Sequence, residues 1–205
     1  MTGGSTTGGT GLLVPYCYSS DNQAVEFVPA AGLGVSFTGG GDAVQVFASR
    51  PEQQIVAATS DLPGQRGVFG NWLCFDSVPR PNRVSATNLV GNFPEVFVTT
   101  MDGRLYERRG FTNVWGAWSE FNRPLPDSRI TDVHVASAVR TRVYVADSGH
   151  VYGTAKTRDD AAAPYDSWRH LGNPRAALVT AGVTRNGGEI VVVVDSCGTV
   201  LSSVD

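Results

Sequence analysis

With 205 residues, the chain is long enough to form one well-buried domain. Charged residues make up only 17%, and 24 glycines and 11 prolines supply turns between short strands, so the composition predicts an all-β protein. The net charge of −3 and the isoelectric point near 5.6 offer nucleic acid and anionic membranes no electrostatic attraction. Neither is expected as a partner.

The first eleven residues, MTGGSTTGGTG, are expected to form a flexible lead-in to a single domain over residues 12–205. They lack the basic and apolar regions of a signal peptide, and no stretch approaches the ~20 apolar residues of a membrane span. A soluble protein is expected, while its location stays open. Cys17, Cys74 and Cys197 are odd in number and form no CxxC pair, so no disulfide, metal site or cofactor is predicted.

A strand pattern recurs along the chain, which is the sequence signature of a repeat protein. Its first marker is an apolar strand before a turn, which recurs at nearly equal intervals with Val46, Val96, Val143 and Val191. A second strand follows each turn and begins at Ile55, Leu105, Val151 and Val200, again at nearly equal intervals. Two markers therefore keep one period of roughly 48 residues, a length typical of propeller repeats.

A third strand in each repeat contains an aromatic residue and is followed by a proline. Trp72, Trp118 and Trp168 occupy the same place in NWLCF, AWSEF and SWRHL, and Ala24 replaces them in AVEFV. A fourth strand, rich in β-formers, then follows in GLGVSF, RVSATN, RITDVHVAS and AALVTAGV. The unit is four short strands.

Sheets of four short strands cannot bury both faces alone, and radial packing of such sheets into a β-propeller solves this problem. About four blades are predicted. The last blade is either closed by the N- and C-terminal strands together or completed by another chain. Leu12–Tyr18 competes with Thr199–Val204 for one strand position, so either it adds a fifth strand or a plug, or the chain is an incomplete ring that closes with another copy. Ile190–Val194 is continuously apolar, which is typical of an innermost strand covered on both faces.

The motif VFV-x3-DG-x-L-x-x-R, followed by W-x-x-W and a proline over Val96–Pro124, resembles the repeats of seven-bladed bacterial propeller lectins. In period and aromatic strand endings the chain is also similar to the six-bladed fucose-binding propeller lectins of fungi and bacteria. That second resemblance implies a sugar held by an arginine on the first strand, a glutamate on the second, and a stacking Trp or Tyr. Arg142 matches the arginine and Glu107 the glutamate, in different repeats.

Carbohydrate recognition needs planar polar groups for hydroxyls and an aromatic face for the sugar ring. The candidate ligand-binding residues are Tyr106, Glu107, Arg108, Trp115 and Trp118 in the best-preserved repeat and Arg142, Tyr144, Tyr165, Trp168 and Arg169 in the next. A tryptophan repeated in several blades is more often packing between blades than a ligand platform. Trp115 has no counterpart, so packing and exposure both stay open for it.

No catalytic constellation stands out in the sequence. His134, His150 and His170 are well separated along the chain and form no metal-ligand motif, so they are interpreted as surface or satisfied loop residues. The chain also lacks a GxSxG elbow and a phosphate-binding loop. We therefore expect a non-enzyme.

Two functions fit these observations. The first is a lectin-like propeller that offers glycans repeated shallow sites between blades, each weak and strengthened by multivalency. The second is a structural or protein-interaction module of a larger assembly, for which one asymmetric apolar patch is expected; a homo-oligomer is an open alternative.

Overall fold

The structure of the chain is a computed structural model. It describes the backbone of residues 16–18, 24–26, 32–38, 43–50, 55–62, 65–69, 72–89, 93–111, 114–137, 140–158, 160, 162–183 and 188–204. Side chains are described for residues 45–49, 78–87, 94–110, 115–137, 140–158, 160, 162–182 and 188–203. The predicted lead-in, residues 1–11, lies outside these ranges. Within them the protein is all-β, and no helix there is long and apolar enough to cross a membrane.

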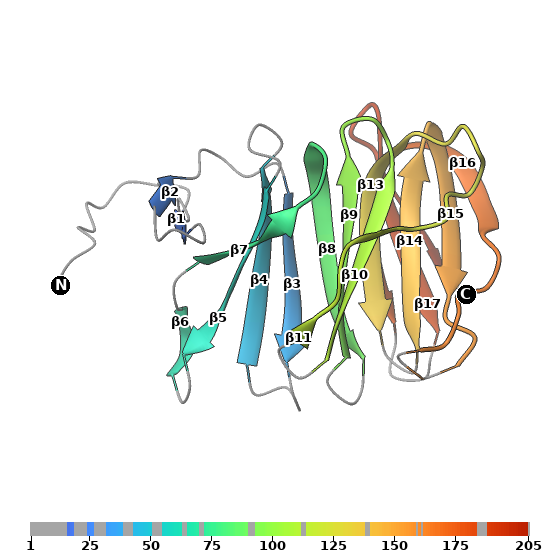
Figure 1. The fold of residues 1–205 in the computed structure, drawn as a ribbon. Coiled ribbons are helices and arrows are strands. Elements are labelled where there is room, and N and C mark those ends of the chain that lie inside the picture. Colours follow the sequence, from blue (N-terminus) through green and yellow to red (C-terminus); the bar gives the residue numbers. More distant parts are fainter. Residues whose placement is uncertain are drawn as a thin grey trace.

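The strands form successive antiparallel sheets that stand side by side like blades (Figure 1). The first blade contains β3 (Gly32–Thr38), β4 (Ala43–Arg50), β5 (Ile55–Leu62) and β7 (Trp72–Ser77), with β6 (Gln65–Phe69) paired to β5. The second blade contains β8 (Pro81–Leu89), β9 (Phe93–Thr100), β10 (Leu105–Phe111) and β12 (Ser119–Glu120), with β11 (Val114–Trp115) paired to the end of β10. Both contain the four strands of the predicted unit.

The third and fourth blades share one long strand, β16 (Arg169–Val183). The third blade contains β13 (Ile130–Ser137), β14 (Thr141–Asp147), β15 (Gly149–Ala155) and the first part of β16. The second part of β16 begins the fourth blade and pairs with β17 (Glu189–Asp195), which pairs with β18 (Val200–Val204). The fourth blade therefore has three described strands.

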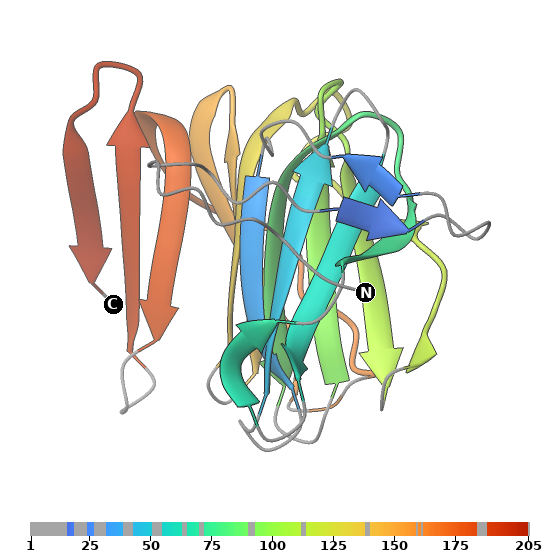
Figure 2. The same cartoon turned by 90° about the vertical axis from the view of Figure 1, so that its left-hand side faces the viewer.

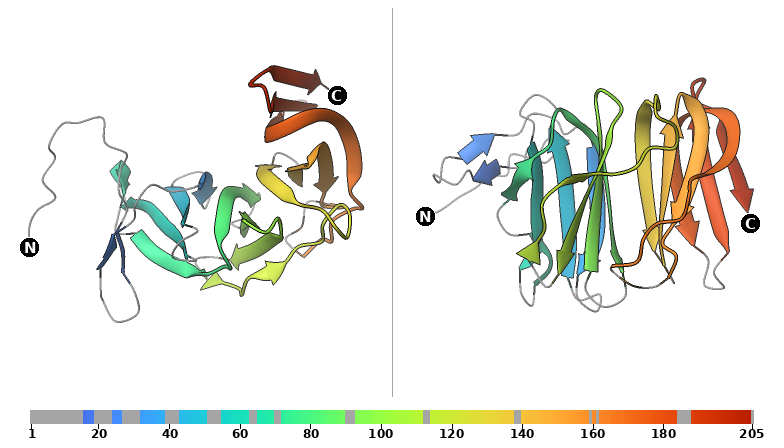
Figure 3. Two further views of the ribbon diagram at one scale, coloured as in Figure 1. Left: turned by 90° about the horizontal axis from the view of Figure 1, so that it is seen from above. Right: turned by 45° about the vertical axis from the view of Figure 1, so that its right-hand side comes forward.

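Seen along the strands, the sheets follow an open arc (Figure 3, left), as expected for part of a β-propeller. The strands β1 (Tyr16–Tyr18) and β2 (Ala24–Glu26) lie at one end of the arc, against the first blade, and β18 lies at the other (Figure 2). β1 pairs in parallel with β7, so this part of Leu12–Tyr18 adds an extra strand, as one alternative predicted. The other part, residues 12–15, lies outside the described ranges.

The predicted closure of the last blade by the two chain ends is wrong for the described strands. β1 and β2 pair with each other and with β7, whereas β18 pairs with β17. The parallel ladder to β7 occupies the hydrogen-bonding groups that β1 would need to reach the fourth blade. Completion of the ring by another chain stays a prediction.

The order of strands within a blade also differs from the predicted unit. The β-rich strands β3, β8, β13 and the second part of β16 open their blades, and neighbouring members lie beside one another around the axis. Ile190–Val194 lies in β17, a second strand, so its assignment as innermost is wrong. The second strand of a blade is paired on both edges, and both of its faces pack against neighbouring blades. A continuous apolar sequence is therefore favoured there as well.

Side chains pack between blades in three clusters, because alternate residues of a strand point to opposite faces. In β9, Val96 and Val98 face the first blade, whereas Phe97 faces the third. Tyr144 of β14 and Val193 of β17 meet in the cluster between the third and fourth blades. Each blade is therefore held by its neighbours.

The fourth blade has no following blade among the described strands, and its side chains are less buried. All seven residues of β14 are buried, but in β17 only Val193 is. Leu178 and Val200, on the face turned away from the third blade, are 40% and 66% exposed. We call this face, formed by Leu178, Val192, Val194 and Val200, the uncovered face.

Polar side chains link the inner strands of successive blades. Ser85 Oγ accepts a hydrogen bond from Val135 N at 3.0 Å, and Asp132 Oδ2 accepts one from Val179 N at 2.8 Å. Burial raises the pKa of Asp132, against the opposing effect of that backbone hydrogen bond. The folded state therefore binds the Asp132 proton more tightly than the unfolded chain does.

We expect Asp132→Asn to remove this part of the pH dependence of stability. In the native protein, proton uptake by Asp132 raises the free energy of unfolding as the pH falls from the raised folded pKa toward the unfolded value of about 3.9. Each tenfold difference in proton affinity contributes about 1.4 kcal/mol, and asparagine keeps an acceptor for Val179 N. Urea denaturation between pH 7 and pH 4 measures the free energy of unfolding of both proteins. The same dependence of this free energy on pH in the two proteins would contradict the prediction.

Candidate functional site

Strand alternation divides the predicted site residues of the second blade between two junctions. Tyr106, Trp115 and Trp118 pack against the cluster shared with the first blade. Arg108 lies over the Trp118 ring, 5.8 Å from its centroid, and its Nε donates to Gly116 O at 2.6 Å. Glu107 points the other way, toward the third blade. The structure therefore does not bring these five residues into one pocket.

Trp115 is partly buried. Its ring meets Phe47 edge-on at a centroid distance of 5.9 Å, and a methyl group on Gly110 would lie 2.9 Å from it. These contacts favour packing over an exposed ligand platform. That Trp115 binds a ligand stays a prediction.

A cleft of about 670 Å³ lies between the second and third blades. Its lining includes Glu107, Arg109, Glu120 and Asn122 together with Tyr165 and Trp168. Two residues predicted from the third repeat, Tyr165 and Trp168, thus meet one from the second, Glu107.

Four charged groups meet behind this cleft. Glu95 is 1% exposed, and its Oε1 lies 2.5 Å from Lys156 Nζ and 3.4 Å from Arg109 Nε. Arg109 also pairs with Glu107, and Tyr165 donates its hydroxyl proton to Glu95 Oε2 at 2.8 Å. Burial raises the pKa of Glu107, while the charge of Arg109 opposes the rise. We call these residues the Lys156 cluster; its two cations and two carboxylates balance.

The aromatic side chains of the cleft pack edge-on. Phe121 lies 4.9 Å from Tyr165 and 6.0 Å from Trp168 between ring centroids, and Trp168 Nε1 donates to Asn122 O at 2.9 Å. Trp168 is half-buried, so its ring both packs between blades and forms part of the cleft wall.

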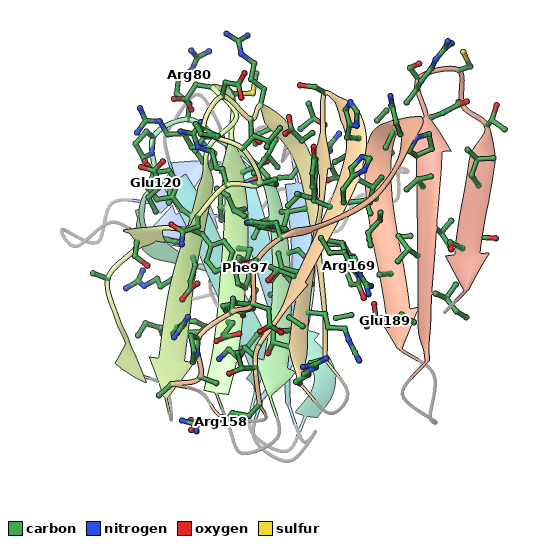
Figure 4. The ribbon with its side chains drawn as sticks, turned by 90° about the vertical axis from the view of Figure 1, so that its right-hand side faces the viewer. Arg80, Phe97, Glu120, Arg158, Arg169 and Glu189 are labelled. Carbon is green, nitrogen blue, oxygen red and sulfur yellow. The ribbon has the colours of Figure 1, made fainter. Side chains whose placement is uncertain are left out.

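The next junction, between the third and fourth blades, repeats the chemistry in a smaller cleft of about 170 Å³. Arg142 Nε lies 2.5 Å from Glu189 Oε1, and Tyr144 donates its hydroxyl proton to Glu189 Oε2 at 2.6 Å. Burial and the neighbouring carboxylate raise the pKa of Tyr144, so it stays a proton donor. Arg169 lies 3.9 Å from the same carboxylate, and Figure 4 shows the two side chains close together between these blades. We call this the Arg142 cleft.

Beside the Arg142 cleft lies a hollow of about 620 Å³ that shares Arg169 and Glu189 with it. Its wall is apolar where Val151, Leu171 and Val191 contribute. The junction therefore combines a polar end with an apolar wall.

Two differences separate the junctions. The Lys156 cluster is balanced in charge, whereas the Arg142 cleft sets two arginines, Arg142 and Arg169, beside Glu189. Arg142 is only 9% exposed, and its Nη1 has no hydrogen-bond partner among the described residues. A buried donor without a partner is costly, and a polar ligand atom would satisfy it.

Sequence reasoning missed Glu95, Lys156 and Glu189. A signal existed, because a glutamate precedes the apolar run in both PEVFV and GEIVVVV. The two glutamates nevertheless occupy positions that differ by one residue. Glu95 pairs with Thr87 in the second blade, whereas the corresponding residue of the fourth blade, Gly182, pairs with Ile190 and not with Glu189. A shift of one residue reverses the face, so Glu95 points to the following blade and Glu189 to the preceding one.

The fold is similar to that of a fungal lectin from Aleuria aurantia, described as a six-bladed β-propeller with a novel mode of fucose recognition. The similarity has a TM-score of 0.61 at 14% identity and covers 92% of this chain and 68% of the lectin. A mutant of the same lectin in complex with α-methyl-L-fucoside gives a TM-score of 0.60 at 15% identity, and the similarity covers 92% of this chain and 68% of the lectin. A protein from Dyadobacter fermentans gives 0.60 at 14% identity, with 95% of this chain and 59% of that one covered.

No protein-family model matches the sequence, and no curated protein is similar to it in sequence. The structural similarities establish the fold: the chain is part of a β-propeller. The match is to the six-bladed type, and the resemblance to the seven-bladed bacterial lectins stays a prediction.

Proposed function

We propose that the protein is a lectin-like propeller that binds carbohydrate between its blades without catalysis, with the Arg142 cleft as its principal site. The observation that carries this proposal is the recurrence of an arginine, a glutamate and a tyrosine in two successive clefts. Arg109, Glu107 and Tyr165 line the first, and Arg142, Glu189 and Tyr144 the second. Repeated clefts of similar chemistry are what a lectin predicts.

This group suits the hydroxyls of a sugar. A guanidinium donates two parallel hydrogen bonds and a carboxylate accepts two, so an Arg–Glu pair can grip neighbouring hydroxyls. In the Arg142 cleft, Arg142 Nη1 offers a donor to a ligand oxygen. The apolar wall of the adjoining hollow, formed by Val151, Leu171 and Val191, suits the C–H face of the ring. The small volume favours one sugar residue at the polar end.

The cleft between the second and third blades is the proposed second site. Its Trp168 ring supplies an aromatic surface, and Glu107 and Arg109 supply the polar pair. Because the Lys156 cluster already satisfies these charges, we expect this site to bind more weakly. The similarity to a lectin that recognises fucose makes L-fucose the first sugar to test.

We expect Arg142→Ala and Glu189→Ala each to weaken glycan binding by at least about tenfold, the loss of a charge-assisted hydrogen bond. The measurement is a glycan array at high valency, followed by titration of the best sugar. Arg158→Ala is the matched control, because the Arg158 side chain is 71% exposed and lies outside both clefts (Figure 4). Equal affinities for all these variants, or no binding to any glycan, would count against the proposal.

The alternative, a protein-interaction module, is favoured by one observation. The uncovered face exposes Leu178 and Val200, two apolar side chains that a blade would normally bury against the next blade. A chain without glycan affinity would make this face the surface to test.

A further inference from the structure

Two histidine rings from different strands meet on the third blade. His150 lies in β15 opposite Asp147, and His170 lies in β16 opposite Tyr152. Because alternate residues of a strand share a face, His150 and Tyr152 point the same way, and the ladder brings His170 beside them. His150 Nδ1 lies 3.0 Å from His170 Nε2, and the ring centroids are 5.2 Å apart.

We propose that His150 and His170 form a two-histidine site for a divalent transition-metal ion, with Cu²⁺ bound more tightly than Ni²⁺ or Zn²⁺. Neutral imidazole is a common ligand of all three ions, and for nitrogen ligands Cu²⁺ gives the most stable complexes. His170 is exposed and His150 half-buried, so an ion can reach both rings from solvent.

The separation of the two nitrogens suits two ligands of one ion. With metal–nitrogen bonds of about 2.0 Å, neighbouring ligands lie about 2.8 Å apart in a square-planar complex and about 3.3 Å apart in a tetrahedral one. The observed 3.0 Å, which the hydrogen bond of the metal-free pair sets, lies between these values. The preference for Cu²⁺ therefore rests on the general order of affinities of nitrogen ligands for these ions.

In the metal-free protein the two nitrogens share one proton, which one ring donates and the other accepts. A metal ion takes the place of that proton, which moves through solvent to the other nitrogen of its own ring. Both imidazoles stay neutral in this exchange, so the pair keeps the same number of protons.

Water completes the coordination. Among the described residues, no group of three or more histidine, cysteine or acidic side chains is placed to hold one ion. The two imidazoles are therefore the protein ligands, and the affinity depends on both binding at once. Removal of either ring abolishes that chelate, for which we expect a loss of about a hundredfold in affinity.

The test is a titration with CuCl₂ in a Cys197→Ser background, because the thiol of Cys197 is exposed and would itself react with copper. We expect one equivalent of Cu²⁺ with an electron paramagnetic resonance spectrum that shows two nitrogen ligands. His150→Ala and His170→Ala should each lose this binding. His134→Ala is the matched control, since His134 lies on β13 and its Nδ1 is 3.4 Å from Thr180 Oγ1.

Thermal denaturation without metal shows whether each variant is folded. Equal copper affinities in the parent and the His150 and His170 variants would overturn the site, as would a spectrum with one nitrogen. Tighter binding of Zn²⁺ than of Cu²⁺ would overturn the stated preference. The experiment is independent of glycan binding, so either proposal can fail alone.

Discussion

Replacing Lys156 with methionine is expected to lower the free energy of unfolding by about 3–5 kcal/mol. Lys156 is fully buried, and its Nζ lies 2.5 Å from Oε1 of the equally buried Glu95. Methionine has a similar volume but no charge, so Glu95 would keep only Arg109 and Tyr165 as partners, in surroundings that solvate a carboxylate poorly. Urea denaturation at neutral pH measures the change.

A double variant separates the charge from the packing. In Glu95→Gln with Lys156→Met the buried pair is neutral, the Tyr165 hydroxyl keeps an acceptor, and Arg109 keeps Glu107. We expect this variant to regain most of the lost stability. Arg158→Met, at an exposed arginine paired with Asp160, should change stability by less than about 0.5 kcal/mol. A loss as small for Lys156→Met would show that the Lys156 cluster is not a structural centre.

The second large effect is expected at a hairpin turn. Gly103 has φ +82°, and a methyl group there would lie 2.7 Å from the Cα of Arg129, which leads into the third blade. Gly103→Ala therefore combines left-handed backbone strain of about 1–2 kcal/mol with a clash against backbone that cannot rotate away. We expect a total loss of about 3 kcal/mol or more.

Gly198 supplies the matched comparison. It occupies the corresponding turn of the fourth blade with φ +84°, but a methyl group there would meet nothing within 4 Å. Gly198→Ala should cost only the backbone strain, about 1–2 kcal/mol. The difference between the losses in free energy of unfolding of the two variants measures the cost of the steric contact between the turn of the second blade and the backbone at Arg129. Equal losses would contradict the close approach seen at Gly103.

The repeat predicted much of the fold because its markers are local. Val46, Val96, Val143 and Val191 do lie on second strands, and Trp72, Trp118 and Trp168 lie at or just before fourth strands. Ring closure was not predictable in this way. It depends on whether the β1 segment pairs with β7 or with a distant strand, and short apolar segments such as Tyr16–Tyr18 carry little register information.

The sequence predicted the types of residue that line the clefts, but not which of these residues share a cleft. Arginine, glutamate and tyrosine side chains do line the clefts between blades, while their role in ligand binding stays a prediction. Assignment by repeat failed, since each cleft takes residues from two blades and each strand contributes to two clefts. Glu107 meets Tyr165 and Trp168 rather than its neighbours Tyr106 and Arg108. Pairing of His150 with His170 was equally hidden, because their separation along the chain acquires meaning only once β15 and β16 lie together.

The continuity of β16 has a mechanical consequence. Its first residues close the third blade against β15 and its last ones open the fourth against β17, without an intervening loop. The strand bends between these two parts, where Arg175 has φ +57° and the ladders on both sides shift register. The chain thus turns from one sheet to the next inside a hydrogen-bonded strand, which ties the outer edge of the third blade directly to the inner edge of the fourth.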